Sequence, residues 1–95
     1  MKKVTVGTLE SSDCQITLSP ATHRHVVIDS VVQAVFGEAI EAVIHRVLDQ
    51  AGLDSVRVDV IDKGALDYAI EARLKTAIKY YEEAADEKEL SIHTG

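Results

Sequence analysis

The chain has 95 residues, of which 46% are hydrophobic and 4% aromatic, a composition typical of one small globular domain with an aliphatic core. Its net charge of −6 argues against nucleic acid or an anionic membrane as a partner and favours basic protein surfaces. The sequence shows no membrane-spanning apolar run and no signal-peptide core, and its single cysteine cannot form an intramolecular disulfide. We therefore expect a cytoplasmic protein.

The first predicted elements are two short strands around a polar interruption. Apolar and polar residues alternate over Val4–Val6 and again over Cys14–Leu18, the period of a half-buried strand. Residues 7–13 (GTLESSD) break this period, because a continuous strand would bury the carboxylate of Glu10 without a partner. The pattern predicts a loop or hairpin tip over residues 7–13 and a buried, unreactive thiol at Cys14.

A third strand and a long helix come next in the chain. Pro20 ends the second strand, and a third is predicted over residues 23–29. Three strands in so short a span predict an antiparallel meander. Ser30 and Gln33 have the spacing of a capping box, and apolar residues then recur at helical spacing over residues 31–50, which predicts the first helix.

The second half of the chain begins with the clearest strand signal, the alternating valines of residues 56–60. Asp62-Lys63-Gly64 then predicts a tight turn. Residues 65–72 fit both periods: the turn favours a returning strand, whereas alanines and a Glu–Lys pair four residues apart favour a helix. We predict a strand over residues 65–72, followed by a helix over residues 73–86.

Together these elements predict an α+β fold, with an antiparallel sheet of four to five strands and two helices packed on one face. No linker, repeat or low-complexity stretch divides the sequence, so residues 1–95 are expected to form a single domain. The polar residues 87–95 are expected to be frayed.

The sequence gives little support for catalysis by the chain itself. His23 and His25 have a spacing that suits a metal, but no third ligand lies nearby, so a solvated strand face is the better interpretation and no metal site is predicted. No Gly-x-Ser-x-Gly elbow or phosphate-binding glycine loop is present, and no histidine can be placed beside Ser11 or Ser12. The acidic run of residues 82–87 is either a partner-facing patch or, more commonly for such runs, a solvated helix end.

Three segments together resemble the acyl carrier (gamma) subunit of citrate lyase. They are residues 7–13 (GTLESSD), 30–40 (SVVQAVFGEAI) and 62–67 (DKGALD), and the resemblance extends from about Val4 to about Ile78. Each motif is modest alone, but their order and separation make the match specific, which composition and periodicity do not show. Tyr68 departs from the family pattern, where a cysteine is expected, and we interpret this position as a packing residue.

The resemblance implies that Ser11 carries a phosphoribosyl-dephospho-coenzyme A arm through a phosphodiester, with Ser12 as the second choice because loop register decides which hydroxyl is offered. The implied cofactor is covalently bound 2'-(5''-triphosphoribosyl)-3'-dephospho-coenzyme A, attached by a prosthetic-group transferase. The thiol of the arm holds an acetyl group; the alpha subunit of citrate lyase exchanges acetyl for citrate, and the beta subunit cleaves the citryl thioester to oxaloacetate. The small subunit is then a non-catalytic carrier, which needs an accessible hydroxyl and no base of its own.

Two other interpretations stay open. A carrier subunit of citramalate lyase or malonate decarboxylase would share these motifs, and a small regulatory or oligomerisation domain would use residues 7–13 only as a turn. Glu10 and Asp13 either steer the loop towards basic partner surfaces or simply keep it solvated.

Overall fold

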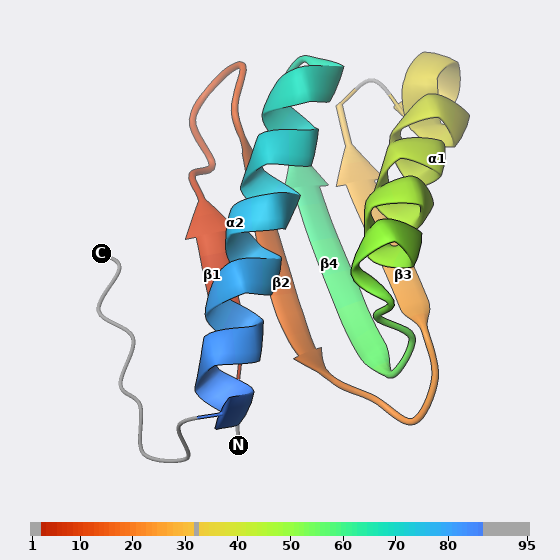
Figure 1. Ribbon diagram of the computed structural model, residues 1–95. Helices are drawn as coiled ribbons and strands as arrows, with labels where there is room; N and C mark the ends of the chain where they lie inside the picture. Colours follow the sequence, from red (N-terminus) through yellow and green to blue (C-terminus); the bar gives the residue numbers. More distant parts are fainter. Residues whose placement is uncertain (1–2, 32, 87–95) are drawn as a thin grey trace.

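The computed structural model describes residues 3–31 and 33–86. Within these residues, four strands and two helices follow in the order β1 (Val4–Gly7), β2 (Cys14–Pro20), β3 (His25–Ser30), α1 (Gln33–Ala51), β4 (Val56–Asp62) and α2 (Asp67–Asp86). Both helices lie on the same face of a single sheet (Figure 1), so the predicted α+β class and helix placement are confirmed. The expected fraying of residues 87–95 concerns a segment outside the described residues.

The sheet is mixed, with the strand order β1-β2-β4-β3, and the predicted antiparallel meander is wrong. β2 pairs antiparallel with β1 and with β4, whereas β3 lies at the outer edge and pairs parallel with β4. Parallel neighbours need a long crossover connection, and α1 supplies it between β3 and β4. The place beside β2 that a meander would give to β3 is therefore occupied by β4.

The region after β4 is helical, so the predicted strand over residues 65–72 is wrong. α2 begins at Asp67 and buries one face at helical spacing, through Ile70, Leu74, Ala77, Ile78 and Tyr81. Leu66 and Tyr68, which completed the apparent strand alternation, are 61% and 72% exposed. The predicted turn at Asp62-Lys63-Gly64 is confirmed, with Gly64 at a φ of 100°, but it leads into a helix.

The core fills the space between the sheet and the two helices. Alternate residues of β2 and β4 point into it, and α1 adds a buried stripe; these residues are Cys14, Ile16, Leu18, Val56, Val58 and Val60 from the strands and Ile40, Ile44, Val47 and Leu48 from α1. The prediction of a buried thiol at Cys14 is confirmed, and burial raises its pKa to about 11. Neither of the two described helices combines the length and apolar character needed to cross a membrane.

One end of the sheet gathers three connections, and we call it the loop end. β1, β3 and β4 all run towards it, so the β1–β2 loop and the starts of α1 and α2 lie there together (Figure 1). At this end Ser30, the last residue of β3, donates its hydroxyl to Asp62 at 2.7 Å, and α1 starts at Gln33 rather than residue 31. The Gln33 half of the predicted capping box lies outside the described side chains.

Candidate functional site

The β1–β2 loop, residues 8–13, is the feature that the sequence singled out, and its entry depends on a glycine. Gly7 has a φ of 99°, and a Cβ atom placed on it would come within 2.0 Å of the carbonyl oxygen of Cys14. The same carbonyl accepts the amide of Thr8 at 3.2 Å, which explains the close approach. Only glycine fits this position without moving the backbone.

Ser11 and Ser12 are the two central residues of a tight turn at the tip of this loop. The amide of Asp13 donates to the carbonyl of Glu10 at 3.1 Å and closes the turn. Ser12 has a φ of 69°, and its amide donates to the carbonyl of Lys63 at 2.8 Å. Both serines are exposed, and neither hydroxyl forms a hydrogen bond within the part of the chain that the structure describes.

Asp13 fixes the base of the loop. Its carboxylate accepts hydrogen bonds from the hydroxyl of Thr8 at 2.5 Å, the amide of Cys14 at 2.7 Å and the guanidinium of Arg73 at 2.8 Å. The hydroxyl of Thr8 foremost, and then Arg73, lower the pKa of Asp13 to about 2. The Asp13 charge is therefore committed to holding the loop, and only Glu10 is left exposed to act on a partner.

The β4–α2 turn supports the loop from the side. The amide of Lys63 donates to the carbonyl of Asp13 at 2.8 Å, and the carbonyl of Lys63 accepts the amide of Ser12 at the same distance. This reciprocal pair joins the two connections through their backbones. The side chain of Lys63 is exposed and forms no ion pair with any residue of the described ranges.

A buried carboxylate holds that turn in place. Asp62 is fully buried, and one oxygen accepts the amides of Gly64 at 3.2 Å and Ala65 at 2.8 Å while the other accepts the hydroxyl of Ser30. The sequence indicated Asp62 only as a turn residue. It gave no sign of the role of Arg73, because Arg73 lies 60 residues from Asp13 in the chain.

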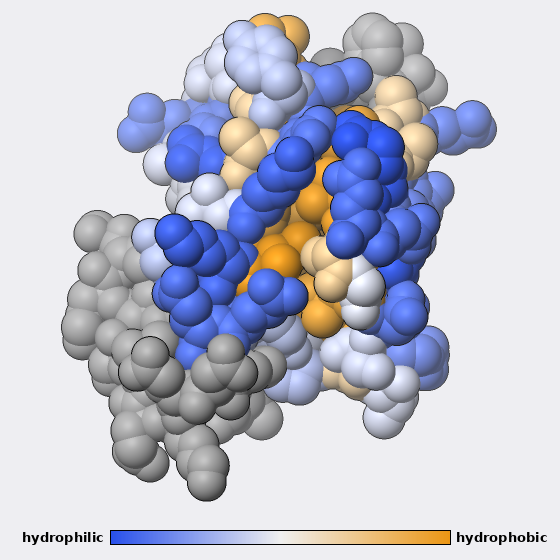
Figure 2. All heavy atoms as spheres, in the orientation of Figure 1, coloured by the Kyte–Doolittle hydropathy of each residue, from blue (hydrophilic) through white to orange (hydrophobic). Residues whose placement is uncertain are grey.

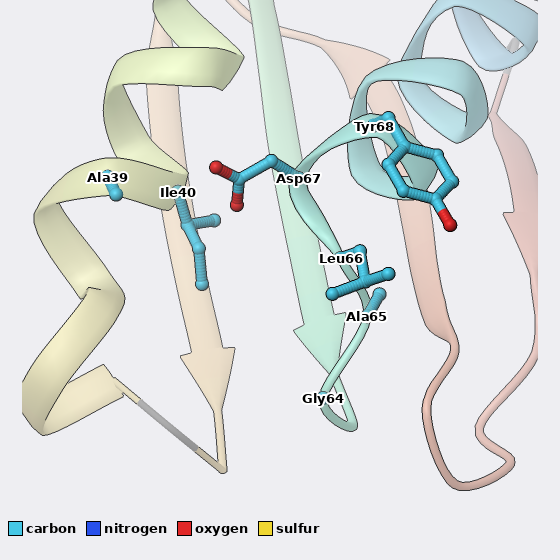
Figure 3. A pocket seen from close by; sticks show the side chains of 7 residues that line it. All are labelled: Ala39, Ile40, Gly64, Ala65, Leu66, Asp67 and Tyr68. Carbon is cyan, nitrogen blue, oxygen red and sulfur yellow. The ribbon is translucent and has the colours of Figure 1, made fainter.

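An open, largely apolar cleft of about 450 Å³ lies beside the loop, between the second turn of α1 and the start of α2 (Figure 3). Its lining consists of Ala39, Ile40, Gly64, Ala65, Leu66, Asp67 and Tyr68. The interpretation of Tyr68 as a packing residue is wrong, because its ring is largely exposed. Figure 2 shows apolar surface in the groove between the helices, flanked by hydrophilic side chains.

The remaining candidates lie elsewhere. The rings of His23 and His25 are 4.2 Å apart, at the start of β3 and so at the opposite end of the sheet from Ser11. The described residues contain no group of three or more His, Cys, Asp or Glu side chains that could hold a metal ion. His45 contacts Arg24 at 3.2 Å. In the acidic run of residues 82–87 the first two side chains are exposed, and the last two lie outside the described side chains.

Comparison with known proteins places the chain in a family. Residues 1–81 match the family model for acyl carrier proteins described as malonate decarboxylase delta subunit (MdcD). The chain belongs to this acyl carrier family. A citrate lyase acyl carrier protein of Fusobacterium nucleatum is 44% identical over 84 residues, covering 86% of this chain and 89% of the relative. Another, of Lacticaseibacillus casei, is 51% identical over 75 residues, covering 78% and 74%.

A solved structure shares the fold. It is a chain of the crystal structure of a Pseudomonas malonate decarboxylase hetero-tetramer in complex with malonate, with a TM-score of 0.71, 18% identity, and coverage of 83% of this chain and 82% of that one. The resemblance drawn from residues 7–13, 30–40 and 62–67 is thus confirmed. The chain is a carrier subunit, and the serine loop is its candidate attachment site.

Proposed function

We propose that this protein is the acyl carrier subunit of a citrate lyase complex and that the hydroxyl of Ser11 is the attachment point of a phosphoribosyl-dephospho-coenzyme A arm. The proposal rests on the exposed hydroxyl of Ser11, which forms no hydrogen bond among the described residues and lies in a turn whose base is fixed by Asp13. Relatives named citrate lyase acyl carrier protein, at 44% and 51% identity, support citrate as the substrate of the complex.

The residues around the loop fit a phosphodiester on Ser11. Two backbone hydrogen bonds join Lys63 to Ser12 and Asp13, and its exposed side chain carries a positive charge that could reach a phosphate on the loop. Arg73 neutralises Asp13, which reduces the repulsion that a phosphate would meet there. When bound, the arm supplies a terminal thiol that holds the acyl group as a thioester.

The loop itself does no chemistry in this proposal. The attaching transferase supplies the base that deprotonates Ser11, and the alpha and beta subunits of the lyase supply the catalytic groups. The contribution of this chain is to present one point of attachment on a rigid base, because tethering raises the local concentration of an acyl group to the millimolar range at each partner site.

The turn geometry favours Ser11 over Ser12. The backbone of Ser12 is held at a φ of 69° and its amide is hydrogen-bonded to the carbonyl of Lys63, whereas no such hydrogen bond holds Ser11 among the described residues. The test is the intact mass of protein exposed to the transferase in its native host. We expect no adduct on Ser11→Ala and full adduct on Ser12→Gly, a control that tolerates the positive φ.

Two results would contradict this assignment. Full modification of Ser11→Ala would move the attachment point to another residue, and an unmodified wild-type protein within an active complex would remove the carrier proposal. Thermal unfolding of both variants shows whether the loop substitutions leave the fold intact.

A carrier subunit for malonate decarboxylation is the second candidate, because the matching family model has that description. Reconstitution separates the two. Modified protein mixed with citrate lyase alpha and beta subunits should form oxaloacetate from citrate, whereas activity only with malonate decarboxylase subunits and malonate would favour the alternative.

A further inference from the structure

We propose that the cleft between α1 and α2 is a docking site for the adenine ring of the protein's own arm, with Leu66 and Tyr68 as its apolar walls. This inference rests on the proposed function, because an arm of dephospho-coenzyme A type contains an adenosine. The family match reaches this region, but nothing in it assigns a role to the cleft.

The cleft begins where the attachment loop ends. Gly64 lines the cleft, and a Cβ atom placed on Gly64 would lie 4.0 Å from the Cα of Ser12. The preceding residue, Lys63, is hydrogen-bonded to Ser12 through its carbonyl. An arm on the neighbouring Ser11 therefore starts at the rim of the cleft, and tethering makes even a weak contact with it highly populated.

The walls of the cleft suit a flat, mostly apolar ring. Leu66 and Tyr68 are 61% and 72% exposed, so their apolar surface is available to a ligand, and covering it would be favourable. Aromatic side chains bind nucleobases by stacking, whatever the base. The volume of about 450 Å³ lies within the range of small-molecule sites.

The charges around the cleft orient the arm. Asp67 is the charged residue of the lining, and its carboxylate points towards Ile40 of α1 (Figure 3). A carboxylate accepts a hydrogen bond from an exocyclic amine, as on adenine, and repels phosphate. Lys63, on the loop side of the cleft, attracts phosphate. These charges thus direct the adenine ring into the cleft and the phosphates to the rim of the cleft. The distal thiol is then free to reach the partner subunits.

The experiment compares protein with and without the arm, after intact mass has confirmed the adduct on Ser11. We expect chemical shift changes at the Leu66 methyl groups and the Tyr68 ring, with nuclear Overhauser contacts from both to the adenine protons. Val27, another exposed apolar residue, lies on the edge strand β3 and should not shift.

A second measurement uses a nucleotide pyrophosphatase added to the modified protein, with cleavage of the arm followed by mass. Docking shields the arm, so Tyr68→Ala should be cleaved about five- to thirtyfold faster than wild type. Tyr68→Phe keeps an aromatic ring for stacking, so its arm should be cleaved at the wild-type rate. The arm of Val27→Ala should also be cleaved at the wild-type rate.

The outcomes separate the two proposals. A confirmed adduct with unshifted Leu66 and Tyr68 signals, or equal cleavage of Tyr68→Ala and wild type, overturns the docking site and leaves the carrier function standing. Absence of any adduct in an active complex overturns both.

Discussion

At the scale of single residues, Gly7 determines whether the β1–β2 loop can form. We predict that Gly7→Ala lowers the free energy of unfolding by about 2–4 kcal/mol, because the new Cβ would meet the carbonyl oxygen of Cys14 at 2.0 Å and the φ of 99° disfavours alanine. Urea unfolding followed by circular dichroism measures the loss. Gly52→Ala is the matched control: it also has a positive φ, 66°, but open space around it, and should lose about 1 kcal/mol. Equal losses would contradict the clash.

Asp13 gives the loop a pH-dependent anchor. Its pKa falls from the ordinary 3.8 to about 2 in the folded protein, so the stability that it adds is complete above about pH 4 and is lost as the pH falls through about 2. After allowance for partial exposure, we predict that Asp13→Asn costs on the order of 1–2 kcal/mol at neutral pH. The difference from wild type should shrink towards zero by about pH 2 in urea titrations.

Glu10→Gln is the matched control for this experiment, because Glu10 is an exposed acid of the same loop whose side chain forms no hydrogen bond or ion pair with the described residues. It should leave stability within about 0.5 kcal/mol of wild type at every pH. A loss in Asp13→Asn that stays constant down to pH 2 would show that the anchor is not the carboxylate charge.

At the scale of elements, the buried carboxylate of Asp62 ties the ends of β3 and β4 to the start of α2. Asp62→Ala removes the acceptor of two amides, those of Gly64 and Ala65, and of the Ser30 hydroxyl. We predict a loss of about 2–4 kcal/mol and a fall in Tm of roughly 10–20 °C, measured by calorimetry. Asp62→Asn keeps one acceptor oxygen and should lose less. Equal Tm values for Asp62→Ala and wild type would show that the turn holds without this carboxylate.

The elements also show which features of the fold were predictable. Strands β2 and β4 each bury alternate residues against the helices, so the alternation of apolar and polar residues was enough to predict both strands. α2 was misjudged at its start because Leu66 and Tyr68 are apolar yet exposed, and pattern reasoning treats apolar residues as buried. The parallel pairing of β3 with β4 depends on the α1 crossover, and no local period encodes the order of strands in a sheet.

Only part of the candidate site was predictable from the sequence. The loop was predictable because an acid and two serines interrupt a strand period, and that signal is local. Its supports were not, because Arg73 and Lys63 reach the loop through tertiary contacts across long separations in the chain. The cleft was hidden for the same reason that α2 was misjudged, since its two exposed walls looked like one side of a strand.

At the scale of the whole molecule, exposed apolar side chains gather at one end of the sheet. Among the described residues, five large apolar side chains are exposed, and four of them, Leu9, Val31, Leu66 and Tyr68, belong to connections or helix starts at the loop end. The fully buried apolar side chains lie between the sheet and the helix faces. Substitution of these exposed apolar side chains should therefore leave the fold intact, whereas Gly7, Asp13 and Asp62 at the same end hold the connections together.

The same substitution at Leu66 and at Leu74 tests whether an exposed apolar residue of the loop end contributes to folding. Leu74 is fully buried on α2, and with an aliphatic core of this size Leu74→Ala should cost about 2–5 kcal/mol in urea unfolding, a large share of the 5–15 kcal/mol typical of a domain. Leu66 lies about two turns earlier and is 61% exposed, so Leu66→Ala should lower the free energy of unfolding by less than about 0.5 kcal/mol. Comparable losses at the two positions would mean that Leu66 contributes to the folding core, and its exposure would then need no ligand to account for it.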